Sequence, residues 1–264
     1  MGTSSSVKTI DRLVKVLDCF SPERPTWSLA EISVHLGLPK STLHRFLASL
    51  ESHGILRRDP DDRRWRLGYR LVIWGELAAR STGLRHIALP VMRDLVAATG
   101  ETVVLTIYQG REVVCVGKVE TSHSVRLKLD VGTRHPPHAG ASSKILMAYL
   151  PVEEVQAIIR ERGLPQVCTN TITDYDDLMA ELARIRELGY AESHEETDVG
   201  AWGVATPIYG PQGAVVAAIG VVGPSSRFSG DLRQQYVSLC QQAARQMSVL
   251  LSTGARPEER LSPI

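Results

Sequence analysis

The sequence predicts an α+β protein with a small N-terminal helix-turn-helix domain and a larger C-terminal α/β domain. Its 264 residues are enough for two domains. Helical patterns dominate the first third, whereas strand and helix patterns are mixed after it. Charge is also divided, since residues 1–70 hold 12 Lys and Arg against 8 Asp and Glu, and the remainder holds 18 against 21. A basic N-terminal module is typical of a domain that meets phosphate.

The N-terminal segment predicts three helices. Apolar spacing indicates the first over Thr9–Phe20. A capping-box pattern begins the second at Ser28, and Gly37 fits its C-cap. The third begins beside Pro39 and ends at Gly54. Only a glycine and a leucine separate the second helix from the third, which is the helix-turn-helix arrangement.

The third helix is the one that such a pair places in the major groove of DNA. Its outward residues are polar and basic near the N-terminal end, where base edges are read. The DNA contacts predicted from the helix pair are Ser28, Lys40, Ser41, Thr42, His44 and Arg45.

A short hairpin follows as a predicted wing. Ile55–Arg58 and Arg64–Leu67 alternate as strands around an aspartate-rich turn. Arg63, Arg64 and Arg66 are predicted to grip the DNA backbone or minor groove. The alternative is a solvated charged hairpin, because three aspartates cancel part of the charge.

A helical stretch over Tyr69–Ser81 then leads into a helix over Leu84–Thr99. Ile73 and Trp74 are large apolar residues in what should be a linker. This pattern predicts a connecting helix that is buried against another chain.

The rest of the chain predicts a mixed α/β domain with a ligand site. Strands are expected over Thr102–Tyr108, Glu112–Val119, Ser124–Leu129, Trp202–Tyr209 and Ala214–Val222, and helices over Ala141–Leu150, Val152–Arg162, Asp174–Leu188 and Gly230–Leu251. A Pro-rich loop precedes the helix that starts at Ala141 and Ser142, where free N–H groups and the helix dipole favour an anion. Most helix ends bind nothing, so this feature alone does not define a site.

Several segments resemble the IclR family of transcription regulators. They are SLAEI (28–32), LGLPKSTLHR (36–45), HAGASSKILMAYL (138–150), WGVATPI (202–208) and AAIGVVGP (217–224). The resemblance implies a winged helix-turn-helix domain over 1–68, a linker helix over 69–83, a GAF-like effector-binding domain over 84–254 and a polar tail over 255–264. It also implies homodimers, often homotetramers, that repress or activate catabolic genes from pseudo-palindromic sites on double-stranded DNA.

The resemblance also implies an effector pocket. Its positions in this chain are Leu127, Leu129, His135, Ala141, Ser142, Ser193, Gly203, Gly220 and Val222. In members that bind small keto acids the last four positions can carry more polar or larger side chains. Here each change removes polarity or volume, so we expect a carboxylated effector that is larger and more apolar than pyruvate, such as an aromatic acid.

Other function classes find little support. His135 and His138, with His194 and Glu195, could suggest a metal site, but two prolines make the histidine segment an extended loop and the four cysteines form no CxxC pair. No metal and no cofactor are therefore expected.

An enzyme is the rival class. The chain has no G-x-S-x-G elbow, no P-loop and no dinucleotide fingerprint, and Ser142-Ser143-Lys144 lacks the S-x-x-K spacing. A DNA-binding regulator without a ligand stays open. No apolar run approaches the ~20 residues that span a bilayer, so we expect a cytoplasmic protein without a membrane partner.

Overall fold

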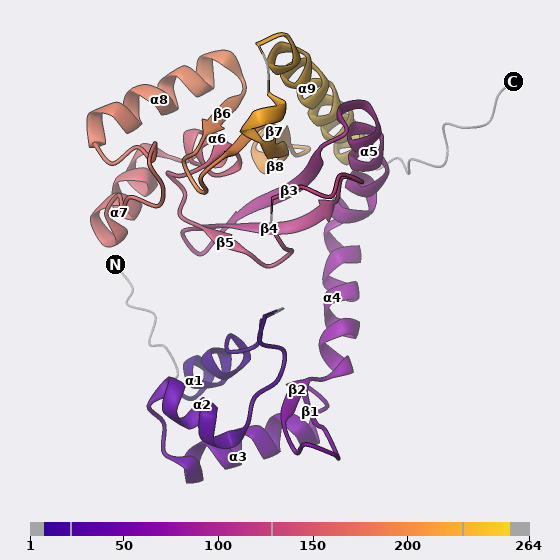
Figure 1. Cartoon of the computed structure of the whole chain (residues 1–264), viewed down its shortest axis with the longest axis vertical. Coiled ribbons are helices and arrows are strands. Elements are labelled where there is room, and N and C mark those ends of the chain that lie inside the picture. The colour runs from indigo at the N-terminus through magenta and orange to yellow at the C-terminus, as the bar shows by residue number, and fades with distance from the viewer. Residues whose placement is uncertain (1–7, 22, 128, 229, 254–264) are drawn as a thin grey trace, which may run out of the picture. The chain divides into compact units, whose positions relative to one another are not determined.

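The structure is a computed structural model that describes residues 8–21, 23–127, 129–228 and 230–253 (Figure 1). It contains two compact units, Met1–Ser81 and Thr82–Ile264, which we describe separately. The expected polar tail over 255–264 lies outside the described residues. None of the described helices is both long enough and apolar enough to cross a membrane.

The first unit contains three helices, a two-stranded hairpin and a fourth helix. These are α1 (Lys8–Leu17), α2 (Leu29–Leu36), α3 (Lys40–Ser52), β1 (Leu56–Arg58), β2 (Trp65–Leu67) and α4 (Tyr69–Thr82). The predicted elements are present, although α1 ends three residues earlier than expected. Its core contains Val16, Ile32, Leu43, Leu47 and Leu56, which are buried against one another.

Both ends of α2 follow the predicted capping chemistry. The Ser28 hydroxyl accepts a hydrogen bond from the Glu31 N–H at 3.3 Å, and the Glu31 carboxylate accepts one from the Ser28 N–H at 2.7 Å. Gly37 adopts a left-handed conformation with φ 63°, which glycine reaches without a Cβ penalty. The cap at Gly37 ends α2 shortly before α3 begins at Lys40.

The second unit is a six-stranded antiparallel sheet between two layers of helix. Its elements are α5 (Leu84–Thr99), β3 (Thr102–Gln109), β4 (Glu112–Val119), β5 (Arg134–His135), α6 (Ala141–Ala148), α7 (Val152–Arg162), α8 (Tyr175–Leu188), β6 (Ala191–His194), β7 (Ala201–Tyr209), β8 (Val215–Pro224), the 3₁₀ turn η1 (Ser225–Arg227) and α9 (Gly230–Thr253). The strand order is β5-β4-β3-β8-β7-β6, and every neighbouring pair is antiparallel.

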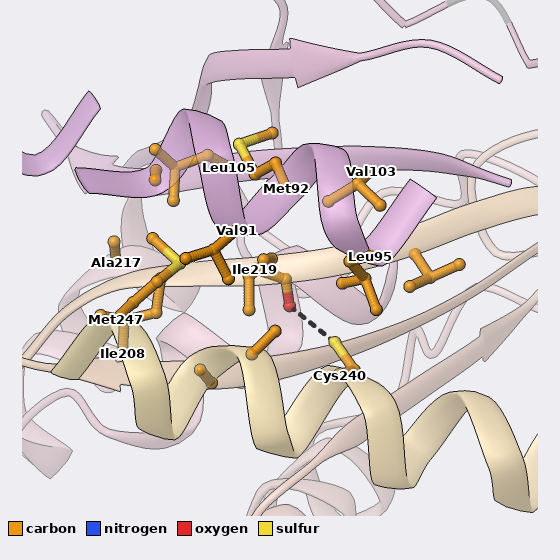
Figure 2. Packing of buried hydrophobic residues seen from close by; sticks show 14 of the residues in the cluster. Val91, Met92, Leu95, Val103, Leu105, Ile208, Ala217, Ile219, Cys240 and Met247 are labelled. Carbon is orange, nitrogen blue, oxygen red and sulfur yellow. Dashed lines mark hydrogen bonds between the residues drawn. The ribbon is translucent and has the colours of Figure 1, made fainter. Parts of the chain in front are cut away.

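The two faces of the sheet bury different helices. Val204 packs in the core with α5 and α9, whereas its neighbour Ala205 packs in the core with α6 and α8. This alternation follows from the two-residue period of a strand. Figure 2 shows the first core, where Val91 of α5 lies near Met247 of α9 and the Cys240 thiol donates to the Ile219 carbonyl at 3.3 Å. A rigid sheet therefore positions α6, which carries the candidate ligand site.

One predicted strand is wrong and two short strands were not predicted. The described residues of Ser124–Leu129 form an irregular segment. The outer edge of β4 pairs with β5 only at its start, where Val113 lies opposite His135 and Val114 lies opposite Arg134. The missed strands β5 and β6 are two and four residues long. Neither carries the run of β-branched residues on which strand prediction depends.

Candidate DNA-binding surface and effector cavity

The outward face of α3 carries a cluster of polar and basic side chains. Lys40, Ser41, His44 and Arg45 are exposed, and Thr42 is half-buried. The opposite face is buried through Leu43, Leu47 and Leu50. Within the described residues, no carboxylate pairs with Lys40 or Arg45, so both cations are free to meet an external anion. The arrangement is that of a recognition helix with a packed inner face.

Arg64 of the wing is already engaged within the domain. Its guanidinium donates to a Glu31 carboxylate oxygen at 2.7 Å and to the Thr26 hydroxyl at 3.1 Å. Hydrogen bonds to Glu31, chiefly from the Ser28 N–H, lower the pKa of Glu31 to about 2. Arg64 therefore fastens the wing to the start of α2. Ser28 is likewise used as the N-cap.

The other two predicted wing contacts differ from each other. Arg66 pairs with Asp59 at 3.0 Å, an ion pair within the hairpin. Arg63 is exposed, with a positive φ of 54°, and its carbonyl accepts from the Arg58 guanidinium at 3.0 Å. All of the predicted DNA contacts, on α3 and on the wing, stay predictions. Of the three wing arginines, only Arg63 has its guanidinium free of an ion pair in the part of the chain described.

A small cavity lies at the N-terminal end of α6. Its volume is about 70 Å³. The lining residues are Leu127, Leu129, His135, Ala139, Gly140, Ala141, Ser142, Ser143, Ser193, Thr197, Asp198, Ala201, Trp202, Gly203 and Val222. The cavity thus brings together eight of the nine predicted effector positions, from the segment before β5 and from β5, α6, β6, β7 and β8. Their role in binding an effector stays a prediction.

The ninth position, Gly220, does not line the cavity but contacts Ser142, which does. A Cβ at Gly220 would be 2.7 Å from the Ser142 hydroxyl and 3.1 Å from the Val204 carbonyl. The bare backbone of β8 thereby leaves room for the Ser142 side chain. Gly203 acts similarly, since a Cβ there would be 3.2 Å from Val222 and 3.8 Å from Ala141.

The helix end itself offers hydrogen-bond donors. The N–H groups of Ser143 and Lys144 donate to the Gly140 carbonyl, and the N–H of Gly140 donates to the Glu196 carboxylate at 3.0 Å. The first-turn N–H groups of Ala141 and Ser142 have no acceptor among the residues described, as expected at a helix start. They are the donors that an anion in the cavity could use.

The two loop histidines have different surroundings. His135 borders the cavity, and its Nε2 is buried without a hydrogen-bond partner in the described chain. His138 Nε2 instead contacts the Pro165 carbonyl at 3.0 Å. Burial lowers the pKa of both rings. In the described part of the chain, no group of three or more His, Cys, Asp or Glu side chains is arranged to hold a metal ion.

Sequence reasoning missed a buried ion-pair network behind the cavity. Lys144 is only 2% exposed, and its ammonium contacts Glu196 at 2.6 Å and Glu181 at 3.0 Å. Glu196 also holds Gly140, so the network supports the first turn of α6. Glu196 and Glu181 lie 52 and 37 residues from Lys144 in the sequence, so no local sequence pattern predicts these ion pairs.

A larger and more open groove of about 550 Å³ lies along β6. Its charged side chains pair mainly with one another, for example Arg233 with Glu192 and Arg184 with Glu181. We place the candidate ligand site in the smaller cavity, because the first-turn N–H groups there have no acceptor among the described residues, whereas the Lys and Arg side chains of the groove are paired with carboxylates.

The models of two domain families match this chain. The IclR helix-turn-helix domain matches residues 9–60, and the C-terminal domain of bacterial IclR transcriptional regulators matches residues 77–249. The repressor AllR of Escherichia coli K12 is 34% identical over 250 residues, covering 95% of this chain and 92% of its own. The regulator KipR of Bacillus subtilis is 32% identical, covering 91% of this chain and 96% of its own.

Solved structures agree with this grouping. An IclR regulator from Alicyclobacillus acidocaldarius superposes with a TM-score of 0.83 at 30% identity, covering 94% of this chain and 98% of its own. An IclR homologue from Microbacterium hydrocarbonoxydans, solved with 4-hydroxybenzoate, has a TM-score of 0.81 at 31% identity, covering 92% and 99%. These relatives are regulators rather than enzymes, and the chain belongs to the IclR family of DNA-binding transcription regulators.

Proposed function

We propose that this regulator responds to a small organic acid with an apolar or aromatic ring, bound in the cavity at the start of α6. The observation that carries the proposal is the pair of unsatisfied N–H groups at Ala141 and Ser142 inside a partly apolar cavity. Among the described lining residues there is no Lys or Arg, and we take the helix end as the anion-binding element of this proposal. The relative solved with 4-hydroxybenzoate supports the ligand class.

The cavity must open to admit such a ligand. Its volume of about 70 Å³ is roughly half of the ~150 Å³ of an engineered cavity that binds benzene. Leu127 and Leu129 stand on the irregular segment rather than on a strand, so they are the wall that we expect to move. Closure of Leu127 and Leu129 over the ring of the ligand would bury apolar surface of both the protein and the ligand.

Calorimetry with 4-hydroxybenzoate and pyruvate tests this proposal. We expect the aromatic acid to bind and pyruvate to bind at least ~10-fold more weakly. Gly203→Val should reduce aromatic-acid affinity because its side chain enters the cavity. Micromolar binding of pyruvate would contradict the size argument. Absence of binding by either acid, with DNA binding intact, would favour a regulator without this ligand.

We further propose that the chain acts as a homodimer joined along α4. Val72, Ile73 and Leu77 are 67%, 59% and 59% exposed and share one helical face with the exposed Tyr69. Burial of this face against a second copy would place two α3 helices on the half-sites of a pseudo-palindrome, about 34 Å or a multiple apart.

Sedimentation tests the dimer. The wild type should sediment as a dimer or a tetramer, and Ile73→Asp should shift it toward smaller species because a charge would enter the apolar interface. Val34→Asp is the control, since Val34 is 84% exposed on α2 and lies outside the proposed interface. A monomeric wild type would contradict the proposal.

A further inference from the structure

The backbone between the wing and α4 packs directly on the end of α3. Gly68, the residue before α4, is buried, and its N–H donates to the Ile55 carbonyl at 2.7 Å. A Cβ at Gly68 would be 2.2 Å from the Gly54 carbonyl oxygen and 3.0 Å from the Ile55 carbonyl carbon. No side chain fits against two backbone atoms at these distances. Glycine therefore permits a backbone-to-backbone contact at this joint.

Arg70 closes the same joint from the first turn of α4. Its guanidinium donates to the His53 carbonyl at 2.9 Å, and its N–H donates to the Gly54 carbonyl at 3.3 Å. His53 is the C-cap of α3, so the cation lies where the helix dipole and the free carbonyls favour it. The guanidinium also lies 4.9 Å from the centre of the Trp74 ring, one turn further along α4.

The opposite end of α4 differs. The two compact units divide between Ser81 and Thr82. Gly83 follows with a left-handed φ of 62°, and a Cβ there would meet nothing within 4 Å. Tight backbone packing thus requires glycine where α4 leaves the DNA-binding domain, whereas no close contact among the described residues requires it at Gly83.

We propose that Gly68 and Arg70 are positioning residues that fix the direction of α4 relative to the recognition helix α3. Helices α3 and α4 then move as one body. This inference rests on the proposed dimer in one respect: in a dimer joined along α4, the same joint sets the spacing of the two recognition helices.

A fixed direction of α4 should affect the affinity for a duplex with two half-sites more than the affinity for a single half-site. A stiff joint holds the second recognition helix near its half-site once the first is bound, which gives a high effective concentration. A loose joint lowers that concentration without altering the contacts of either α3 helix with DNA. Loss of Arg70 should therefore weaken binding to a duplex with two half-sites and spare binding to a single half-site.

The test uses the full chain and two duplexes, one with both half-sites of a site selected from random DNA and one with a single half-site. Arg70→Met removes the donors and keeps an unbranched stem, whereas Arg70→Lys keeps a cation that can reach the His53 carbonyl. Arg12→Met is the control for general charge loss, because Arg12 is exposed on α1 and has no ion-pair partner among the described residues. Gly68→Ala is a further variant that should fold less well.

We expect wild type to prefer the paired duplex by at least ~10-fold, and Arg70→Met to reduce that preference at least ~5-fold while matching Arg12→Met on the single half-site. Arg70→Lys should restore most of the preference. Equal loss on both duplexes would show that Arg70 contacts DNA directly, and an unchanged preference would show that the joint is stiff without it; either overturns the inference. A wild type without a paired preference would contradict the proposed dimer itself, and the inference with it.

Discussion

The two units of this chain use their charged residues in opposite ways. On α3, Lys40 and Arg45 are exposed and have no carboxylate partner in the described structure, so their charge is available to DNA. In the second unit, Lys144 is buried and its ammonium is held by Glu196 and Glu181. The comparison teaches that the location of a cation predicts its role less well than whether a protein carboxylate already satisfies it.

The wing arginine Arg64 combines features of both units. Arg64 belongs to the DNA-binding unit, yet Glu31 neutralises it as part of the domain framework. The basic composition of the first 70 residues therefore overstates the charge that faces DNA.

The largest effect should come from Lys144→Met. Removal of the ammonium leaves the Glu196 and Glu181 carboxylates without their buried partner, which should cost about 3–5 kcal/mol in the free energy of unfolding of the second unit. Urea unfolding measures this. Lys144→Met with Glu196→Gln should recover part of the loss. Arg184→Met, on the 43% exposed side of the same network, should cost no more than ~1 kcal/mol.

Gly220→Ala should destabilise the second unit by about 1–3 kcal/mol, because the new methyl group overlaps the Ser142 hydroxyl and approaches a backbone carbonyl. It should also weaken aromatic-acid binding by displacing Ser142. Calorimetric unfolding provides the measurement. Gly75→Ala is the matched control in α4, where nothing lies within 4 Å, and it should leave the second unit unchanged. Equal stability of Gly220→Ala and wild type would contradict the packing argument.

The smallest effect concerns acid stability of the first unit. The pKa of Glu31 is lowered to about 2 from 4.5, chiefly by the hydrogen bond from the Ser28 N–H. Because the folded value is the lower one, the stability contributed by ionised Glu31 is complete above about pH 4.5 and is lost as pH falls toward 2.

Thermal unfolding of the first unit should therefore depend less on pH in this window for Glu31→Gln than for wild type. Glu51→Gln, an exposed position on α3, should retain the wild-type profile. Parallel profiles for wild type and Glu31→Gln would contradict the role assigned to this carboxylate.

The sequence predicted features that depend on neighbours along the chain. The capping box, the left-handed Gly37 and the apolar face of α3 were foreseen because each is encoded within a few residues. The same holds for the two strands predicted over Trp202–Tyr209 and Ala214–Val222, which the structure contains as β7 and β8. The predicted ligand positions were collected through family resemblance, and the structure brings eight of them to one cavity.

Features that depend on distant partners were not foreseen. The ion pair of Arg64 with Glu31 joins residues 33 apart, and that of Lys144 with Glu196 joins residues 52 apart. The segment predicted as a strand over Ser124–Leu129 has an alternating pattern, yet its described residues pair with no strand, and the two-residue strand β5 pairs with β4 instead. Close backbone contact of Gly68 with Gly54 likewise becomes visible only when the end of α3 and the start of α4 are placed together.

We expect the unpaired cations on α3, rather than exposed cations in general, to bind DNA. Fluorescence anisotropy with a duplex from the upstream region of this gene, in wild type, Arg45→Ala and Arg160→Ala, tests it most directly. Both arginines are exposed and lack an ion pair among the described residues, but Arg160 lies on α7 of the second unit. We predict salt-sensitive binding that Arg45→Ala weakens about 10- to 100-fold and that Arg160→Ala leaves within about twofold of wild type. Equal effects of the two substitutions, or unchanged affinity in Arg45→Ala, would contradict the account.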